Sequence, residues 1–166
     1  MIASLPMYDW PEVRAATDEF WAALQRHVPG LPALDRRAHY TDTWREPSLV
    51  FSQTCGYPFT HEFRGSLTYV ATPHYGVDGC QGPNYCSFAF AREDRPLESL
   101  RGARAAVNNL DSMSGMLAMK LLFAPFAQDG RFFASVIESG GHVKSMEAVR
   151  DGRADVCTID AVCVAL

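Results

Sequence analysis

Apolar and β-rich stretches in the first half of the chain predict a mixture of helix and strand. An apolar stripe at helical spacing predicts a helix over residues 10–27, with Asp9 as its N-cap. Runs rich in β-forming residues predict short strands at residues 48–53, 66–73 and 85–90. A further short strand is expected at the N-terminus, before Tyr8.

The second half shows a regular alternation that begins after a charged, proline-containing break at residues 92–96. Its pattern predicts strands at residues 105–108, 132–137 and 154–159, and helices at residues 112–123 and 142–151. Strands that alternate with helices are typical of βαβ units and a parallel sheet. We therefore expect an α/β protein, with a first α/β lobe in residues 1–90 and a second in residues 91–166.

Composition and charge narrow the class of protein. The chain has 166 residues, of which 48% are hydrophobic and 20% charged, as in ordinary folded proteins. The formal net charge is −4 and is spread evenly, with 6 basic and 9 acidic residues in 1–90 and 9 and 10 in 91–166. This balance argues against a nucleic-acid binder, which would carry a basic stripe. No apolar run reaches the roughly 18–20 residues of a membrane span.

The two ends of the chain raise expectations about export and completeness. The N-terminus lacks the basic and apolar regions of a signal peptide, so the protein is expected to stay in the cytoplasm or to be a mature or trimmed form. Residues 161–166 start an apolar segment that has no polar cap or glycine stop. We expect the chain to end before its fold does.

The five cysteines do not indicate a metal or cofactor. Their odd number leaves at least one thiol unpaired. Cys80 and Cys86 flank a hairpin-like loop and could form a disulfide, whereas Cys157 and Cys163 resemble small core residues. No spacing of Cys or His suggests zinc, so we expect no metal and no cofactor.

The junction between the predicted strand at 105–108 and the helix that follows it carries the strongest candidate site. Asn109, Ser112 and Ser114 supply an amide and two hydroxyls there, and Gly115 permits close approach of a ligand. Free N–H groups and the positive end of the helix dipole at such a junction favour an anion. Simple N-capping of the helix by Asp111 or Ser112 explains the same residues equally well.

Two further candidates occupy equivalent places. His142 follows Gly140 and Gly141 at the start of the next predicted helix, and Asp160 ends the last predicted strand. Each could instead be a capping residue, and His142 could be an ordinary surface histidine. However, ligands of open α/β sheets bind outside the carboxyl ends of the strands, where all these groups fall.

The first half offers polar groups at corresponding positions. Tyr8 follows the expected first strand, and Gln53 and Tyr57 lie at or just after the end of the strand at 48–53. Two lobes that each present polar loops suggest a ligand held between them.

These motifs resemble type 2 periplasmic binding proteins of the phosphate/phosphonate ABC-transporter family, the phosphonate-binding group. The resemblance spans essentially the whole chain and keeps the order of the motifs. Its most specific part is the hydroxyl-rich Ser112–Gly115 junction followed by Ser139-Gly140-Gly141-His142. The remaining parts are Ser4–Tyr8, Ser52–Pro58 and Gly152–Asp160.

The resemblance implies two α/β lobes with mainly parallel sheets, joined by crossover strands and closing on the ligand like a hinge. Ser112, Ser114 and His142, with the Met113 backbone, would hold the phosphonate or phosphate oxygens. Asp160 would pair with an amino group of the ligand, and Tyr8 and Tyr57 would wall the site. The expected ligand contacts are Tyr8, Gln53, Tyr57, Asn109, Ser112, Met113, Ser114, His142 and Asp160.

The resemblance also implies what the protein does. It would bind a small phosphorus-containing anion for uptake through an ABC transporter permease in the periplasm, and it would not be an enzyme. Family members continue beyond this length and return to the first lobe, so that lobe is expected to be incomplete here. Uncovered apolar surface would then permit self-association.

Three alternatives remain open at this point. The same fold could serve as a ligand-sensing module of a regulatory system. Cys55 with His142 or His74 could form a cysteine-dependent hydrolase, although nothing in the sequence places them together. A sugar- or pyrimidine-precursor enzyme on this fold is the third.

Overall fold

The computed structural model describes residues 1–166. Internal contacts divide the chain into two compact units, Met1–Thr68 and Tyr69–Leu166. We refer to them as the first and second unit and describe each by itself. None of the helices combines the length and the apolar character that crossing a membrane requires.

The first unit is built on two short parallel strands. β1 (Ile2–Ser4) pairs with β2 (Leu49–Ser52), and three helices accompany them: α1 (Arg14–His27), α2 (Tyr40–Arg45) and α3 (Gly56–His61). The two strands and the first helix were expected in this part of the chain, although α1 starts later than predicted, whereas α2 was not predicted. The parallel pairing places the carboxyl ends of both strands at the same edge.

A small apolar core holds this unit together. Trp21 of α1 is 4% exposed and packs with Ala3 and Leu5, and its ring lies 5.5 Å from that of Phe51. Burying a side chain of this size stabilises the packing of the helix on the strands by about 2–3 kcal/mol. The prediction of Asp9 as N-cap is wrong, because the carboxylate is paired with the guanidinium of Arg36 instead.

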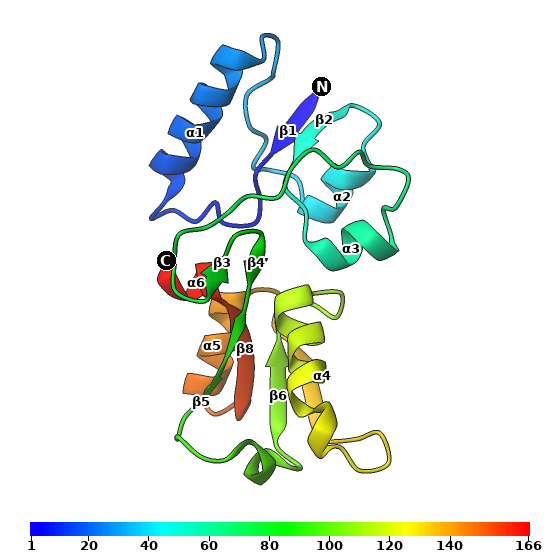
Figure 1. The fold of residues 1–166 in the computed structure, drawn as a ribbon, viewed down its shortest axis with the longest axis vertical. Coiled ribbons are helices and arrows are strands. Elements are labelled where there is room, and N and C mark those ends of the chain that lie inside the picture. Colours follow the sequence, from blue (N-terminus) through cyan, green and yellow to red (C-terminus); the bar gives the residue numbers. More distant parts are fainter. The chain divides into compact units, whose positions relative to one another are not determined.

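The second unit contains a four-stranded mixed sheet (Figure 1). Its strands lie in the order β5 (Ser87–Ala91), β8 (Val156–Asp160), β6 (Arg104–Val107) and β7 (Ser135–Glu138). β6 is parallel to both β7 and β8, whereas β5 is antiparallel to β8. The carboxyl ends of β6, β7 and β8 therefore share one edge, as the alternating pattern predicted.

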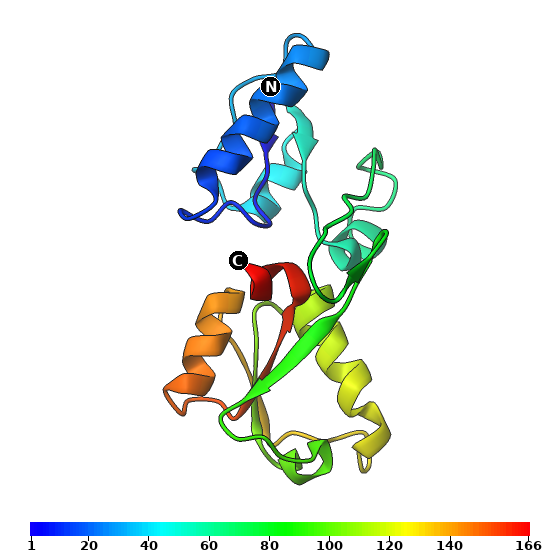
Figure 2. The same ribbon diagram turned by 60° about the vertical axis from the view of Figure 1, so that its left-hand side comes forward.

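Helices cover both faces of this sheet. α4 (Ala118–Phe123) and α5 (His142–Arg150) lie on opposite sides, and α6 (Ala161–Ala165) follows β8 directly (Figure 2). All five residues of β8 are buried, as expected for a central strand covered on both faces. The α4 side contains the main core, made of Leu100, Ala105, Val107, Met119, Phe123, Phe132 and Val156.

Short elements complete the second unit. β3 (Cys80–Gln81) and β4 (Asn84–Tyr85) form a small antiparallel hairpin. Single helical turns occur at Leu97–Leu100, Met113–Leu117 and Ala124–Phe126, the second of which has π geometry. Cys80 and Cys86 lie at this hairpin, but both are free thiols, as are the other three cysteines.

One predicted strand is absent from the structure. The prediction of a strand at 66–73 is wrong, because the segment has no partner strand and leaves Tyr69 and Val70 exposed. The compact units divide at residue 68, and β5 pairs along its length with β8 within the second unit. The lobes at 1–90 and 91–166 stay a prediction about how the molecule works.

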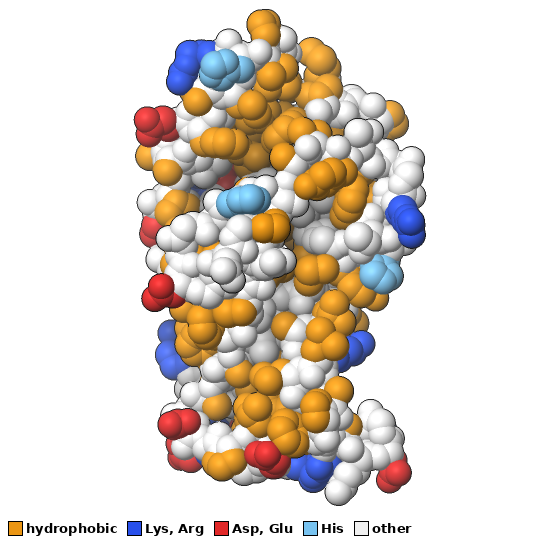
Figure 3. Space-filling model, viewed as in Figure 1, with side chains coloured by type: hydrophobic (Ala, Val, Ile, Leu, Met, Phe, Trp, Pro, Cys, Tyr) orange, Lys and Arg blue, Asp and Glu red, His pale blue; other side chains and the backbone are white.

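Charged groups are spread over the surface. On the face shown in Figure 3, Lys and Arg side chains lie apart from one another among hydrophobic and uncharged atoms. Several arginines are paired with carboxylates, such as Arg104 with Asp155 at 2.8 Å. The second partner of Asp155 is Arg92, at 3.2 Å.

Candidate functional site

The candidate site of the second unit lies at the carboxyl edge of its sheet. Three neighbouring strands each lead into a loop or helix that carries a polar side chain. Ser114 comes from the segment after β6, His142 begins α5 after β7, and Asp160 is the last residue of β8. Since β8, β6 and β7 are adjacent and parallel, these groups converge.

The segment after β6 begins with a π turn over Met113–Leu117. The Leu117 N–H donates to the Ser112 carbonyl at 2.9 Å, an i to i+5 bond, and the Ser112 Oγ accepts from the Gly115 N–H at 3.0 Å. Ser112 is therefore an N-cap, as the simpler interpretation held. Its hydroxyl proton stays available to a ligand, and the first N–H groups of the turn have no acceptor within the helix.

Gly115 fixes the position of this turn. A Cβ at residue 115 would lie 1.9 Å from the Asn108 Oδ1, so no other residue fits without a shift. The Gly115 carbonyl also accepts a hydrogen bond from the buried Thr158 Oγ1 at 2.7 Å. The turn that carries Ser114 is therefore hydrogen-bonded to the middle of β8 and lies in close contact with Asn108 after β6.

The loop between β7 and α5 is held just as closely. Gly140 has a φ of 82°, which favours glycine, and its N–H donates to the Asn108 carbonyl at 2.8 Å. The Ser139 N–H donates to the Val107 carbonyl at 2.8 Å, and the Ser139 and Ser145 hydroxyls lie 2.7 Å apart. These bonds fix the first residue of α5, His142, at the edge of the sheet.

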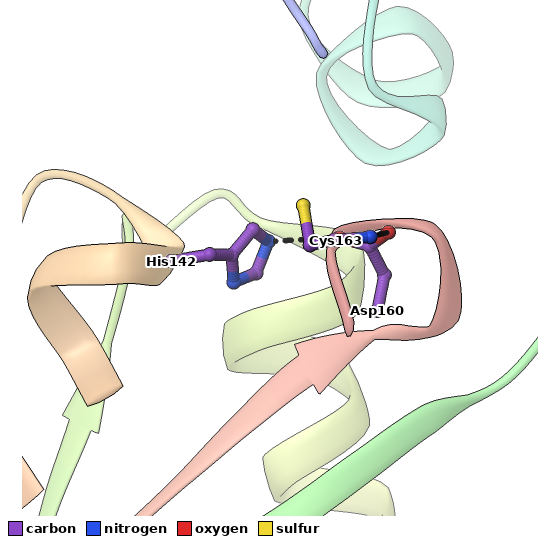
Figure 4. Close-up of side chains that lie close together, drawn as sticks. All are labelled: His142, Asp160 and Cys163. Atoms are coloured by element: carbon purple, nitrogen blue, oxygen red, sulfur yellow. Dashed lines mark hydrogen bonds and ion pairs between the residues drawn. The ribbon is translucent and has the colours of Figure 1, made fainter. Parts of the chain in front are cut away.

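His142 links the other two side chains. Its Nε2 lies 3.0 Å from the Ser114 Oγ and 3.2 Å from the Asp160 Oδ2, and its side chain is 12% exposed (Figure 4). Burial lowers the pKa of His142, and the charge of Asp160 offsets only part of that shift. The imidazole is therefore neutral at pH 7, and a neutral ring has one N–H to donate.

This geometry differs from that of a serine hydrolase triad. A triad uses one imidazole nitrogen toward the serine and the other toward the carboxylate. Here both Ser114 and Asp160 contact Nε2, while Nδ1 is buried without a hydrogen-bond partner. The arrangement offers no carboxylate that would orient a histidine base.

The cysteine alternative gains no support. Cys55 belongs to the first unit and His74 and His142 to the second, so no pairing of them is defined. Cys163 is the thiol beside His142, but burial and the neighbouring Asp160 raise its pKa. A protonated, buried thiol is a poor nucleophile.

Asp160 also caps the last helix. Its Oδ1 accepts a hydrogen bond from the Cys163 N–H at 2.9 Å, so the capping interpretation of Asp160 is confirmed. Its other oxygen faces His142. The Cys163 Sγ lies within 4.8 Å of the ligand atoms of both residues, which gives the site an N, O, S set that could hold a metal ion.

Sequence reasoning missed two residues near Asp160. One is Cys163, which was interpreted as core. The other is Tyr75, where burial and the nearby Asp160 charge raise the pKa to about 12. The sequence did contain a signal for Cys163. It is residue N3 of the helix that Asp160 caps, and the N3 residue of a capped helix lies beside the capping side chain. No pattern in the sequence pointed to Tyr75.

The other predicted residues fall into two groups. Met113 opens the π turn, and the Asn109 carbonyl accepts from the Ser112 N–H at 3.2 Å, so both belong to the second-unit site. Tyr8, Gln53 and Tyr57 belong to the first unit, beyond the carboxyl ends of β1 and β2.

In the first unit, hydrogen bonds hold the backbone of Gln53, and ring stacking orients Tyr57. The Gln53 N–H donates to the Ser4 carbonyl at 3.2 Å, and its carbonyl accepts from the Trp44 Nε1 at 3.0 Å. The ring of Tyr57 stacks on that of His61, with centroids 4.0 Å apart. This places an amide and an aromatic side chain at the carboxyl edge of the small sheet.

Comparison with protein-family models gives a match for most of the chain. Residues 48–166 match the family model described as the periplasmic substrate-binding protein of phosphonate ABC transporters. The match covers more than two thirds of the chain and includes every element from β2 to α6. A comparison with curated proteins found no match. The α/β architecture and the family match together show that this chain belongs to the phosphonate-binding family of periplasmic ABC-transporter substrate-binding proteins.

Proposed function

We propose that the carboxyl edge of the second sheet binds the phosphonate group of an aminoalkyl phosphonate, which the protein delivers to an ABC transporter permease. The observation that carries the proposal is the convergence of Ser114 and Asp160 on the His142 Nε2, at 3.0 and 3.2 Å. The family match supports the class of ligand and the transport role.

Hydrogen-bond donors at this edge suit a tetrahedral oxyanion. The hydroxyls of Ser112 and Ser114 and the backbone N–H of Met113 surround the start of a helical segment, where the helix dipole favours negative charge. The His142 Nε2–H adds a fourth donor. Neutral donors explain how a protein of net charge −4 can hold an anion.

Asp160 favours a ligand that carries a positive charge in addition to its phosphonate group. Its carboxylate is 3% exposed and lies at the same edge as the donors. A plain phosphate dianion would be repelled there, whereas an ammonium group on the ligand would pair with the carboxylate. A zwitterionic ligand such as 2-aminoethylphosphonate satisfies both halves of the site.

The remaining predicted residues belong to the proposal as additional contacts. Asn109 borders the π turn in the second unit. Tyr8, Gln53 and Tyr57 are proposed to contact the ligand from the first unit. Operation in the periplasm and docking to a permease follow from the family.

Calorimetric titration of the chain tests this function. The ligands are 2-aminoethylphosphonate, methylphosphonate, phosphate and sulfate, tested on the wild type, on Ser114→Ala and on Ser66→Ala as a control in the first unit. We expect 2-aminoethylphosphonate to bind most tightly and sulfate not to bind.

Ser114→Ala removes a hydroxyl from a charge-assisted hydrogen bond, and should weaken binding of 2-aminoethylphosphonate by about 1.5–3 kcal/mol. Ser66→Ala should leave the affinity unchanged. Equal affinity of the wild type and Ser114→Ala, or equal affinity for sulfate and the phosphonates, would contradict the proposal.

A further inference from the structure

His142, Asp160 and Cys163 form a compact group of three metal-ligating side chains (Figure 4). Their ligand atoms, an imidazole nitrogen, a carboxylate oxygen and a thiol sulfur, all lie within 4.8 Å of one another. We propose that this trio is a binding site for one thiophilic divalent cation, with Zn²⁺ as the reference ion.

The distances are close to those of a bound metal. Zinc bonds of roughly 2.0–2.3 Å in a tetrahedral arrangement hold ligand atoms about 3–4 Å apart. The His142 Nε2 and the Asp160 Oδ2 already lie 3.2 Å apart. The Cys163 Sγ lies within 4.8 Å of both of these atoms, so it must move closer to them to complete the trio around an ion.

The backbone holds two of the ligands in place. Asp160 caps α6 through its Oδ1, which accepts from the Cys163 N–H at 2.9 Å. Both residues are buried, at 3% and 8% exposure. Because the cap uses Oδ1, the other oxygen is directed at His142, and Cys163 is kept one turn away on the same short helix.

The third ligand comes from a separate element that is also fixed. His142 is the first residue of α5 and is anchored by the Gly140 N–H bond to Asn108. Its Nδ1 is buried and has no hydrogen-bond partner. Binding of a metal ion at the Nε2 lone pair requires the ring proton to be on Nδ1.

The chemistry of the set favours zinc-like ions over calcium or magnesium. One nitrogen, one sulfur and one oxygen match the ligands of Zn²⁺ and Co²⁺, whereas calcium and magnesium prefer oxygen ligands alone. A dication would also compensate the charge of a carboxylate that is buried beside a neutral imidazole. The Ser114 Oγ, 3.0 Å from the His142 Nε2, or a water supplies the fourth ligand.

The site uses the His142 Nε2 and the Asp160 carboxylate that the proposed function assigns to the phosphonate ligand, so metal and ligand are alternative occupants of these atoms and are tested separately. The test of the metal site uses Co²⁺ alone, added to the full chain after chelator treatment and reduction with a non-thiol reductant. Co²⁺ bound by a thiolate gives a sulfur-to-metal charge-transfer band in the near ultraviolet. We expect this band to saturate at one Co²⁺ per chain and to disappear when Zn²⁺ displaces the cobalt.

Cysteine variants identify the ligand. The band should be lost in Cys163→Ala and in Cys163→Ser, and should persist in Cys55→Ala and Cys80→Ala. Circular dichroism reports whether each variant folds. Asp160→Asn keeps an N-cap side chain but loses the charge, and should weaken Co²⁺ binding by at least about tenfold, the lower end of the loss seen when even an outer-shell partner of a metal is removed.

Three results would overturn the site: no band in the wild type, a band that survives in both Cys163 variants, or a band that depends on Cys80. Because the metal titration contains no anion, a negative phosphonate titration with a positive cobalt band would reject only the proposed function. The reverse pair of results would reject only the metal site.

Discussion

The carboxyl edges of the two small sheets use their polar side chains differently. In the first unit, the Ser4 and Ser52 hydroxyls lie 2.8 Å apart and the Trp44 Nε1 donates to the Ser52 Oγ at 3.1 Å and the Gln53 carbonyl at 3.0 Å. These bonds join strands to a helix. In the second unit, side chains from three separate strand ends meet one another at His142.

The strands beneath the two edges differ as well. β2 has three half-buried residues and one exposed residue, whereas every residue of β8 is buried. A strand covered on both faces is a rigid support, and a binding group is positioned more accurately on such an element than on a loop. We therefore propose that the second unit sets the geometry of anion binding, and the following predictions test that division of roles.

The largest effect should come from Gly115→Ala. The new Cβ would lie 1.9 Å from the Asn108 Oδ1, so either the π turn or the end of β6 must move. We expect a loss of about 1–3 kcal/mol in the free energy of unfolding, the usual cost of overpacking, measured by urea denaturation. Calorimetry should show anion affinity reduced by at least about tenfold, because Ser114 moves with the turn.

Gly76→Ala is the matched control for this change. Residue 76 has open space around its Cα and lacks a positive φ, so the substitution should alter neither the stability nor the affinity. Normal anion binding in Gly115→Ala would show that the π turn does not position the donors.

Asp160→Asn should change which ligand is preferred. The amide can still cap α6, so the fold is expected to remain, but the negative charge is lost. Affinity for 2-aminoethylphosphonate should fall by about tenfold, corresponding to the loss of one partly buried ion pair, while affinity for methylphosphonate stays or rises. Calorimetric titration of both ligands checks this, and an equal loss for the two would assign Asp160 a purely structural role.

Trp44→Phe examines the first unit. The change removes the indole N–H that bonds to Ser52 and Gln53, and should cost about 1–2 kcal/mol in the free energy of unfolding. If the second unit sets anion binding, the affinity for methylphosphonate should change far less than in Gly115→Ala. Trp10→Phe, outside this network, serves as the control in the same urea and calorimetry measurements.

The smallest effect concerns pH. Burial holds the pKa of His142 below its ordinary value of 6.5, so the folded protein takes up this proton less readily than the unfolded chain. The contribution of neutral His142 to the free energy of unfolding is therefore fully present above pH 6.5 and is lost as the pH falls below that value. Urea midpoints of the wild type should decline more steeply below pH 6.5 than those of His142→Gln, and parallel declines would contradict the assignment.

The sequence predicted the second unit better than the first. Alternating strands and helices over residues 105–159 fix a parallel sheet, and parallel strands bring their carboxyl ends to one edge, so the meeting of Ser114, His142 and Asp160 followed from the order of the elements. The segment 66–73 failed because β propensity supplies no partner strand.

Packing details could not be predicted from spacing. Val143, Met146 and Val149 recur at helical spacing and predict one inner face of α5, yet Val143 and Met146 are 51% and 40% exposed. The buried face is formed by Ser145, Ala148 and Val149, since small residues let the helix approach the sheet. Tyr75 likewise comes near Asp160 through the path of a loop, which no local pattern specifies.

The π turn after β6 makes the site sensitive to chain length. Its i to i+5 bond from Leu117 to Ser112 accommodates one residue more than a regular α-turn would. Deleting a single residue between Met113 and Leu117 would give a more regular helix, but it would shift the phase of everything before it by about 100°. A deletion that makes the helix more regular would therefore rotate Ser114 away from His142.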